Sequence, residues 1–171
     1  MKNFITLLLV LLLVACSSSG KKSVDKLYYR FPETSITSTA SLIVKRPTAM
    51  GILGNRPMVA QTANGSLKQM HNNFWLDSPK VLLHNYLLKV FSTTPIENNM
   101  ILESQILKLE KKQQQTALEI KFTLKDIKGK LVFSKTYSEI QNLDNNTISS
   151  FTHSVGQMLE NFIKQLVNDI Q

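Results

Sequence analysis

The sequence predicts an α+β fold: a single domain in which two helices pack on one face of a mostly antiparallel sheet. Three observations lead to this class. The segment Ala117–Ile127 alternates apolar and polar residues, two longer stretches repeat apolar residues every three or four positions, and short turns between strands favour antiparallel pairing. The expected order is three strands, a helix, three strands and a second helix. The chain has 171 residues, 43% of them apolar, which suits one domain with a buried core.

The first three strands are expected before the first helix. Ser41–Lys45 reads as a strand that stops at Pro47. A segment with two glycines and a proline then breaks regular structure before a short second strand, Met58–Gln61. Asn64-Gly65 is a two-residue turn of the kind that needs positive φ, so Ser66–His71 is expected to return as a hairpin partner.

The first helix begins at a clear start signal. Ser78 is a suitable N-cap, and Pro79 is well placed in the first turn. Apolar residues then follow at helical spacing, and Thr93-Thr94-Pro95 ends the pattern. The expected buried stripe consists of Val81, Leu82, Leu83, Tyr86, Leu87, Val90 and Phe91.

The second half predicts a three-stranded meander and a long helix. Its strands are Met100–Leu109, Ala117–Ile127 and Lys130–Glu139, joined by the polar turn Lys111–Gln115 and by Lys128-Gly129. The middle strand alternates cleanly, with Leu118, Ile120, Phe122 and Leu124 on one side and Glu119, Lys121, Thr123 and Lys125 on the other. Asn145 and Asn146 can cap the final helix, whose apolar stripe is Ile148, Phe151, Val155, Leu159, Phe162, Leu166 and Ile170.

Catalytic and metal chemistry has no recognisable motif here. The chain has one cysteine, which excludes an internal disulfide, and His71, His84 and His153 are too scattered for a local metal site. No phosphate-binding glycine loop or nucleophile elbow occurs. The sequence therefore predicts a protein that is not an enzyme, with no catalytic residue, no metal and no cofactor. The net charge of +8 comes from dispersed lysines, which gives a basic surface and no nucleic-acid-binding motif.

The N-terminus has the pattern of an export signal. Lys2 gives a positive start, and Phe4–Ala15 is apolar except for Thr6. The apolar run is too short to span a bilayer as a helix. We therefore expect residues 1–15 to be a signal peptide.

The end of that segment, Leu13-Val14-Ala15-Cys16, resembles a bacterial lipobox. The resemblance implies cleavage before Cys16, a diacylglycerol on its thiol and an acyl chain such as palmitate on its amine. Several chains are needed for stable anchoring. By resemblance to enteric lipoproteins, Ser17 acts in sorting and lets the protein pass to the outer membrane, facing the periplasm, where Asp would retain it at the inner membrane. Residues 16–26 then read as the lipidated cysteine with a flexible tether, and residues 27–171 as the domain.

Three residues within the domain are candidates for contact with a partner or a lipid. Phe74 and Trp75 precede the first helix. The pattern favours a packed pair that fixes the helix start to the sheet, and the alternative is an exposed aromatic patch. Arg56 can hold a phosphate or a carboxylate, although a solvent-facing loop arginine is commoner.

An ordered set of short motifs follows the tether. It comprises Tyr28-Tyr29 with Pro32, the strand ending at Pro47, Asn55-Arg56-Pro57-Met58-Val59, Trp75 ahead of Ser78-Pro79, and Leu82-Leu83-x-x-x-Leu87. Together they resemble the ABC-type transport auxiliary lipoprotein family, although Gln61–Asn73 lacks the tyrosine expected before the tryptophan. The resemblance implies a non-enzymatic periplasmic docking component of an intermembrane lipid or solvent transport system. Its implied partners are an MCE-type substrate-binding protein, an ABC permease and an ATPase.

Other functions for an anchored domain of this kind stay open. One is an assembly lipoprotein for an outer-membrane β-barrel, and another is a periplasmic lipid carrier. An envelope hydrolase is a more distant alternative. The sequence does not identify the transported molecule, the direction of transport or the stoichiometry.

Overall fold

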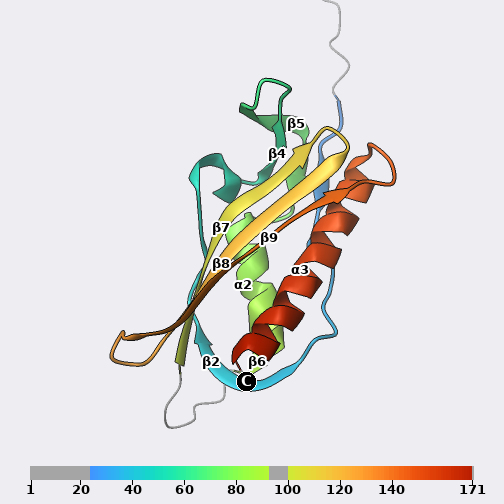
Figure 1. The fold of residues 1–171 in the computed structure, drawn as a ribbon. Coiled ribbons are helices and arrows are strands. Elements are labelled where there is room, and N and C mark those ends of the chain that lie inside the picture. Colours follow the sequence, from blue (N-terminus) through green and yellow to red (C-terminus); the bar gives the residue numbers. More distant parts are fainter. Residues whose placement is uncertain (1–23, 93–99, 171) are drawn as a thin grey trace, which may run out of the picture.

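The computed structural model describes residues 24–92 and 100–170. Two helices and a mixed sheet form one α+β domain (Figure 1). The first half contains β1 (Leu27–Tyr29), β2 (Ser38–Val44), β3 (Thr48–Ala49), the 3-10 turn η1 (Gly51–Gly54), β4 (Pro57–Gln61), β5 (Leu67–Trp75), α2 (Pro79–Val90) and β6 (Phe91–Ser92). The second half contains β7 (Met100–Lys112), β8 (Gln115–Lys125), β9 (Leu131–Asn142) and α3 (Ile148–Ile170).

The predicted meander is confirmed and forms the longest part of the sheet. β8 pairs antiparallel with both β7 and β9. Its even-numbered residues from 118 to 124 are buried, whereas Glu119, Lys121, Thr123 and Lys125 lie on the other face. The two turns place Gln113 at a φ of 49° and Gly129 at a φ of 83°. Glycine is the residue that adopts such a conformation without strain, which suits Gly129 to its turn.

The other edge of β7 carries a parallel component that the sequence did not predict. β2, β3 and β4 lie one after another along this edge, each parallel to β7. β5 then pairs antiparallel with β4, and β1 pairs parallel with β5. Parallel strands need a long connection, and the chain between β4 and β7 contains β5, α2 and β6, so β2, β3 and β4 can run in the same direction as β7. The sheet is therefore mixed, although its longest ladders are antiparallel.

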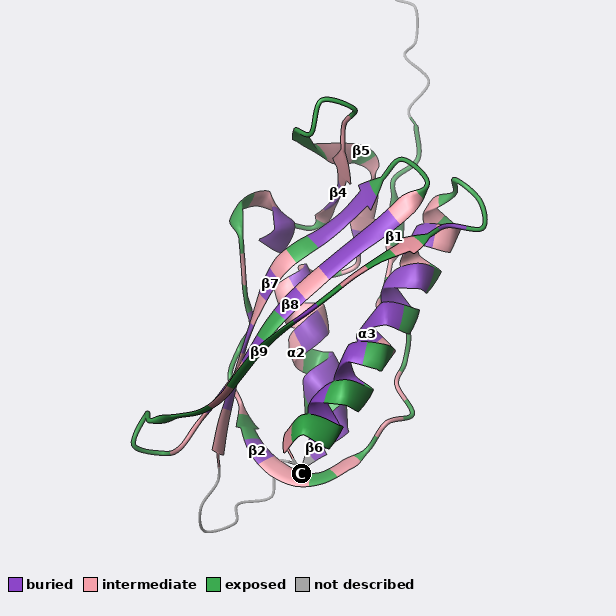
Figure 2. Cartoon of the chain, viewed as in Figure 1, coloured by how far each residue is buried: buried purple, intermediate pink, exposed green. Residues whose placement is uncertain are grey.

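Both helices lie on the same face of the sheet, as predicted (Figure 1). α3 packs against β8 and β9, and α2 lies beside β2 and β6. Figure 2 shows the buried stripe of each helix turned toward the sheet. The buried positions common to prediction and structure are Leu83, Tyr86, Leu87 and Val90 in α2 and Phe151, Val155, Leu159, Phe162 and Leu166 in α3. One apolar core joins both helices to the strands.

The cap of α3 differs from the prediction. The Thr147 hydroxyl accepts a hydrogen bond from the Ser150 amide at 3.2 Å, so Thr147 caps the first turn. Asn145 instead braces this threonine by accepting its backbone N–H at 3.2 Å. Asn146 accepts a hydrogen bond from the Lys111 ammonium, at the end of β7. The two asparagines therefore support the helix start without capping it.

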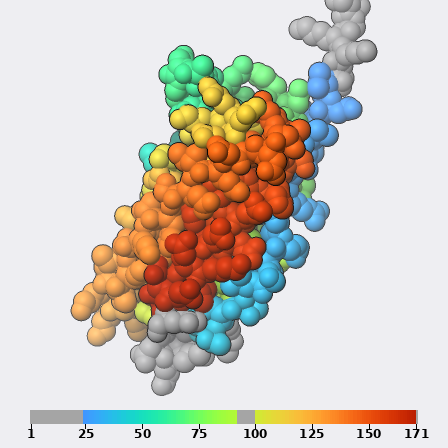
Figure 3. Space-filling model, turned by 45° about the vertical axis from the view of Figure 1, so that its right-hand side comes forward, coloured from blue at the N-terminus to red at the C-terminus, as the bar shows by residue number. Residues whose placement is uncertain are grey.

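A strap of irregular chain, residues 30–37, connects β1 to β2 and runs alongside α3. Figure 3 shows this blue segment on the surface beside the red helix. Pro32 approaches α3 at Gly156, where an added Cβ would lie only 2.2 Å from the proline Cγ. The strap therefore covers one side of the apolar core. Among the described residues, no helix is long and apolar enough to cross a membrane.

Candidate functional site

The structure describes three of the five predicted site residues and places them in two environments, the core and the surface. Cys16 and Ser17 lie outside the described residues, so the lipidation and sorting assignments stay predictions. Trp75 is in the core, while Phe74 and Arg56 lie at the surface. Phe74 and Trp75 form the end of β5, which runs beyond the predicted strand Ser66–His71.

Trp75 is only 2% exposed and packs between two phenylalanines. Its ring meets the ring of Phe31 edge-on, with centroids 5.1 Å apart, and lies 6.0 Å from the ring of Phe151. These contacts join the end of β5 to the strap and to the start of α3. Trp75 therefore presents almost no surface to a partner in this structure.

Phe74 points to the opposite face of the sheet from Trp75, because successive side chains of a strand alternate. It is half-buried, and its ring lies 5.5 Å from that of Tyr28, its register partner in β1. Tyr28 itself is 50% exposed. Two aromatic rings from neighbouring strands thus form a small exposed platform.

Two cationic side chains make cation–π contacts with these rings. The Lys26 ammonium lies 5.6 Å from the centre of the Phe74 ring, and the Arg56 guanidinium lies 5.3 Å from the centre of the Tyr28 ring. Arg56 Nε also donates to the Trp75 carbonyl at 3.4 Å. Lys26, Tyr28, Arg56 and Phe74 are called the aromatic–cation cluster below. Sequence reasoning singled out Arg56 and Phe74 separately; the pairing of β4 with β5 brings Arg56 beside the end of β5, and the pairing of β1 with β5 adds Tyr28.

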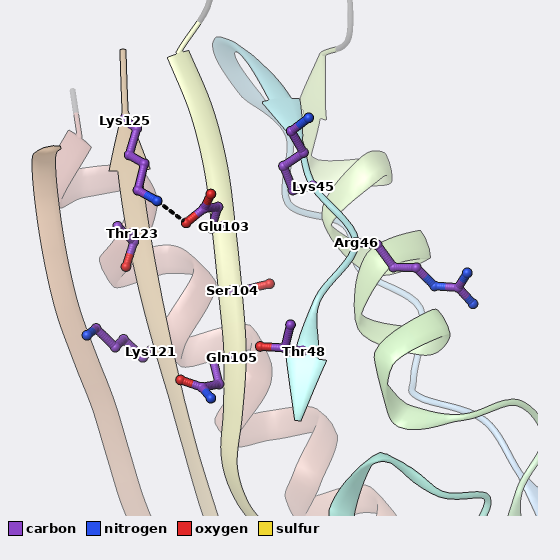
Figure 4. Close-up of a pocket in the computed structure, with 9 residues that line it drawn as sticks. All are labelled: Lys45, Arg46, Thr48, Glu103, Ser104, Gln105, Lys121, Thr123 and Lys125. Carbon is purple, nitrogen blue, oxygen red and sulfur yellow. Dashed lines mark hydrogen bonds and ion pairs between the residues drawn. The ribbon is translucent and has the colours of Figure 1, made fainter. Parts of the chain in front are cut away.

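A second feature is a shallow polar depression on the outer face of the sheet (Figure 4). It has a volume of about 720 Å³ and spans β7, β8 and the chain between β2 and β3. Its acidic residue, Glu103, accepts a hydrogen bond from the Lys125 ammonium at 2.6 Å, and Figure 4 shows Arg46 extending away from β7. The lining residues are Lys45, Arg46, Thr48, Glu103, Ser104, Gln105, Lys121, Thr123 and Lys125.

The titratable groups with displaced pKa values lie elsewhere. Burial raises the pKa of Glu110, against the lowering effect of Lys108 and Lys112. Burial lowers the pKa of Lys111. Burial, followed by the hydrogen bond to Asp169, raises the pKa of the Tyr137 hydroxyl. These groups are spread over the sheet and do not converge on one reacting centre.

The three histidines are also separate from one another. His71 and His153 are exposed, and Nε2 of His84 lies 3.3 Å from the Val44 carbonyl oxygen. Within residues 24–92 and 100–170, no three His, Cys, Asp or Glu side chains come close enough to hold a metal ion. The aromatic–cation cluster and the polar depression are two surface features that present charged side chains to a ligand or partner.

Solved structures share this architecture. An uncharacterised protein matches 86% of this chain and 100% of its own, with a TM-score of 0.74 and 15% identity. Protein XCC0632 from Xanthomonas campestris, of the DUF330 family, matches 82% of this chain and 92% of its own, with a TM-score of 0.69 and 15% identity. The shared feature is the fold.

Other comparisons add little to this likeness. Lipoprotein GNA1162 from Neisseria meningitidis aligns over 75% of this chain and 99% of its own at 15% identity, but its TM-score of 0.35 is too low to support an argument. No protein-family model matches the chain, and no curated protein matches it.

Proposed function

We propose that this chain is a lipid-anchored periplasmic lipoprotein of the outer membrane and a non-enzymatic docking component of an MCE-type ABC transport system. The observation that carries the proposal is the lipobox-like Leu13-Val14-Ala15-Cys16 in front of a short polar segment and a compact domain. The motif order that resembles the auxiliary lipoprotein family supports the transport role. The fold shared with a DUF330 protein is compatible with it.

The anchor acts by keeping the domain close to the membrane. Residues 17–26 are ten residues, and a flexible chain of that length spans roughly 17 Å root-mean-square. Two or more acyl chains on Cys16 make the attachment stable. Confinement near the membrane raises the effective concentration of the domain toward a membrane-bound partner. The mechanism is therefore anchoring and docking, and ATP hydrolysis belongs to a separate polypeptide.

The docking proposal is tested by cross-linking in the envelope followed by affinity purification of the full-length protein. Recovery of an MCE-type protein together with its permease is the expected result. The Cys16→Ala variant removes the acylated thiol, and it should recover these partners more weakly. Recovery of a β-barrel alone would contradict the proposal and favour an assembly function. Bound phospholipid in stoichiometric amount, without partners, would favour a lipid carrier.

The anchor itself is tested separately. Growth with labelled palmitate should label the wild-type protein and leave Cys16→Ala unlabelled. Ser17→Asp should keep the label while moving the protein to the inner-membrane fraction, because Asp at this position acts as a retention signal in the enteric lipoproteins that the sequence resembles. A wild-type protein without label would refute lipid anchoring.

A further inference from the structure

We propose that the aromatic–cation cluster contacts an anionic phospholipid surface and thereby holds the domain in one orientation on the membrane. The proposal rests on the proposed function, since Cys16 would supply the anchor. It adds a second contact made by the folded domain itself. The partner of this surface is the headgroup layer of an anionic bilayer.

The chemistry of the cluster fits the boundary between headgroups and acyl chains. Tyr28 combines an apolar ring with a hydroxyl, and aromatic side chains of this kind favour the membrane interface. Lys26 and Arg56 are exposed, and each contributes a charge that anionic lipids attract. Val24, two residues before Lys26 in the chain, is 65% exposed and adds an apolar side chain close to the cluster in the sequence.

The two cations are not neutralised within the described fold. The ion pairs in residues 24–92 and 100–170 involve Lys89, Lys108, Lys125, Lys135 and Lys164, each with a carboxylate. Lys26 and Arg56 instead lie over aromatic rings, which leaves their charge available to phosphate groups. The cluster is therefore basic as well as aromatic.

The cluster also lies at the start of the folded domain, close in sequence to Cys16, the proposed anchor. β1 begins directly after Lys26, and Figure 1 shows the first described residues at the end of the domain opposite the β8–β9 turn. Even fully extended, the ten residues 17–26 that follow Cys16 reach only roughly 35 Å. Lys21 and Lys22 add positive charge to this short connection. An anchored domain therefore keeps the cluster within reach of the headgroups.

The test measures the depth of a nitroxide label near the cluster. The label is placed on Asn55→Cys, next to Arg56, in the full-length acylated protein on vesicles. Phosphatidylglycerol mixed with phosphatidylcholine is compared with phosphatidylcholine alone. Collisions with membrane-dissolved oxygen and with a water-soluble nickel chelate then report whether the label lies at the headgroups. We expect headgroup contact on the anionic vesicles only, and its loss at high salt, because salt screens exposed charges.

Lys26→Glu combined with Arg56→Glu should abolish this contact. Each lost cation weakens attraction to an anionic surface roughly fivefold, and reversal of the charge weakens it further. The matched control is Lys128→Glu with Lys130→Glu, which makes the same change in net charge at the opposite end, in the β8–β9 turn. This control should keep the contact. If the double variant unfolds, the single variant Lys26→Glu still tests the proposal. The Lys26 ammonium lies over the ring of Phe74, and its replacement should reduce the headgroup contact of the label in part.

The outcomes separate this proposal from the proposed function. Equal label depth in the wild type and the Lys26/Arg56 variant, or an equal loss in the Lys128/Lys130 control, would overturn the cluster proposal while leaving the anchor intact. A wild-type protein that leaves the vesicles altogether would refute the anchor. In that case sedimentation of the unanchored chain with the same vesicles tests the cluster, which predicts binding to anionic vesicles and its loss in the Lys26/Arg56 variant.

Discussion

Adjacent residues at the end of β5 have opposite roles. Trp75 is packed between Phe31 and Phe151, whereas Phe74 lies on the outer face beside Tyr28. The alternation of side chains along a strand produces this division. At the end of β5, one residue of the aromatic dipeptide therefore belongs to the core and the other to the outer face.

This division predicts unequal costs for two substitutions. Trp75→Ala removes a large side chain from the core and should lower the free energy of unfolding by about 3–5 kcal/mol. Phe74→Ala removes one exposed aromatic pair and should cost about 1 kcal/mol. Urea unfolding of the purified variants, followed by circular dichroism, measures both. Equal costs would contradict the assignment of Trp75 to the core.

Glu110 predicts a pH dependence with a definite sign. Burial raises the pKa of its carboxyl above the ordinary value of 4.5, so the folded state favours the protonated form. The stabilising contribution of this group is present at pH values below its unfolded pKa and is lost as the pH rises through its folded pKa. Glu110→Gln, which stays uncharged, should therefore become more stable relative to the wild type over this rise in pH.

The control for this titration is Glu119, on the neighbouring strand. The hydrogen bond from Lys108 lowers the pKa of Glu119, so its contribution is present at pH values above its unfolded pKa and is lost on acidification. Glu119→Gln should therefore lose stability relative to the wild type as the pH rises. Denaturant midpoints across a pH series compare the two variants. A Glu110→Gln variant that tracks the wild type at every pH would show that burial does not penalise this carboxylate.

At the scale of elements, the packing of the strap against α3 depends on Gly156. Alanine is normally better than glycine inside a helix by about 1 kcal/mol. At position 156, however, a Cβ would lie 2.2 Å from Cγ of Pro32 and 2.9 Å from its Cδ. The close approach of the strap therefore requires a residue without a side chain at this point of α3.

We expect Gly156→Ala to destabilise the protein by about 1–3 kcal/mol, the usual cost of overpacking. Pro32→Ala removes the two nearest ring atoms, so the double variant should recover much of this loss. Asn161→Ala, exposed on the same helix, serves as the control for a change in helix propensity. Thermal unfolding of the four variants checks the pattern. A Gly156→Ala protein that is more stable than the wild type would mean that Pro32 leaves room for a side chain at position 156.

Element prediction from the sequence succeeded where a local pattern was complete. The alternation of β8, the stripes of both helices and the glycine turns fixed the meander and the helices to within a few residues. The pattern did not reveal β1, β3 and β6, because strands of two or three residues show no periodicity. The parallel pairing along β7 and the meeting of Tyr28 with Phe74 depend on contacts between distant segments, which local spacing does not encode.

At the scale of the whole molecule, one core connects all the larger elements. Residues of α2, α3, β2 and the strands from β4 to β9 contribute to the same buried cluster. Trp75 is the only tryptophan of the chain, and it touches both the strap and α3. Its fluorescence therefore reports the junction between the early strands and the last helix.

This continuity predicts a single cooperative transition. A domain of this size with one core is expected to unfold without populated intermediates. Unfolding in urea should therefore give the same midpoint by Trp75 fluorescence and by far-ultraviolet circular dichroism, which follows both helices. Gly156→Ala should shift the two midpoints together, because the strap, α3 and Trp75 belong to one packed unit. Loss of tryptophan burial at a lower urea concentration than loss of helix would instead show that β1, β4 and β5 form a separate, weaker unit.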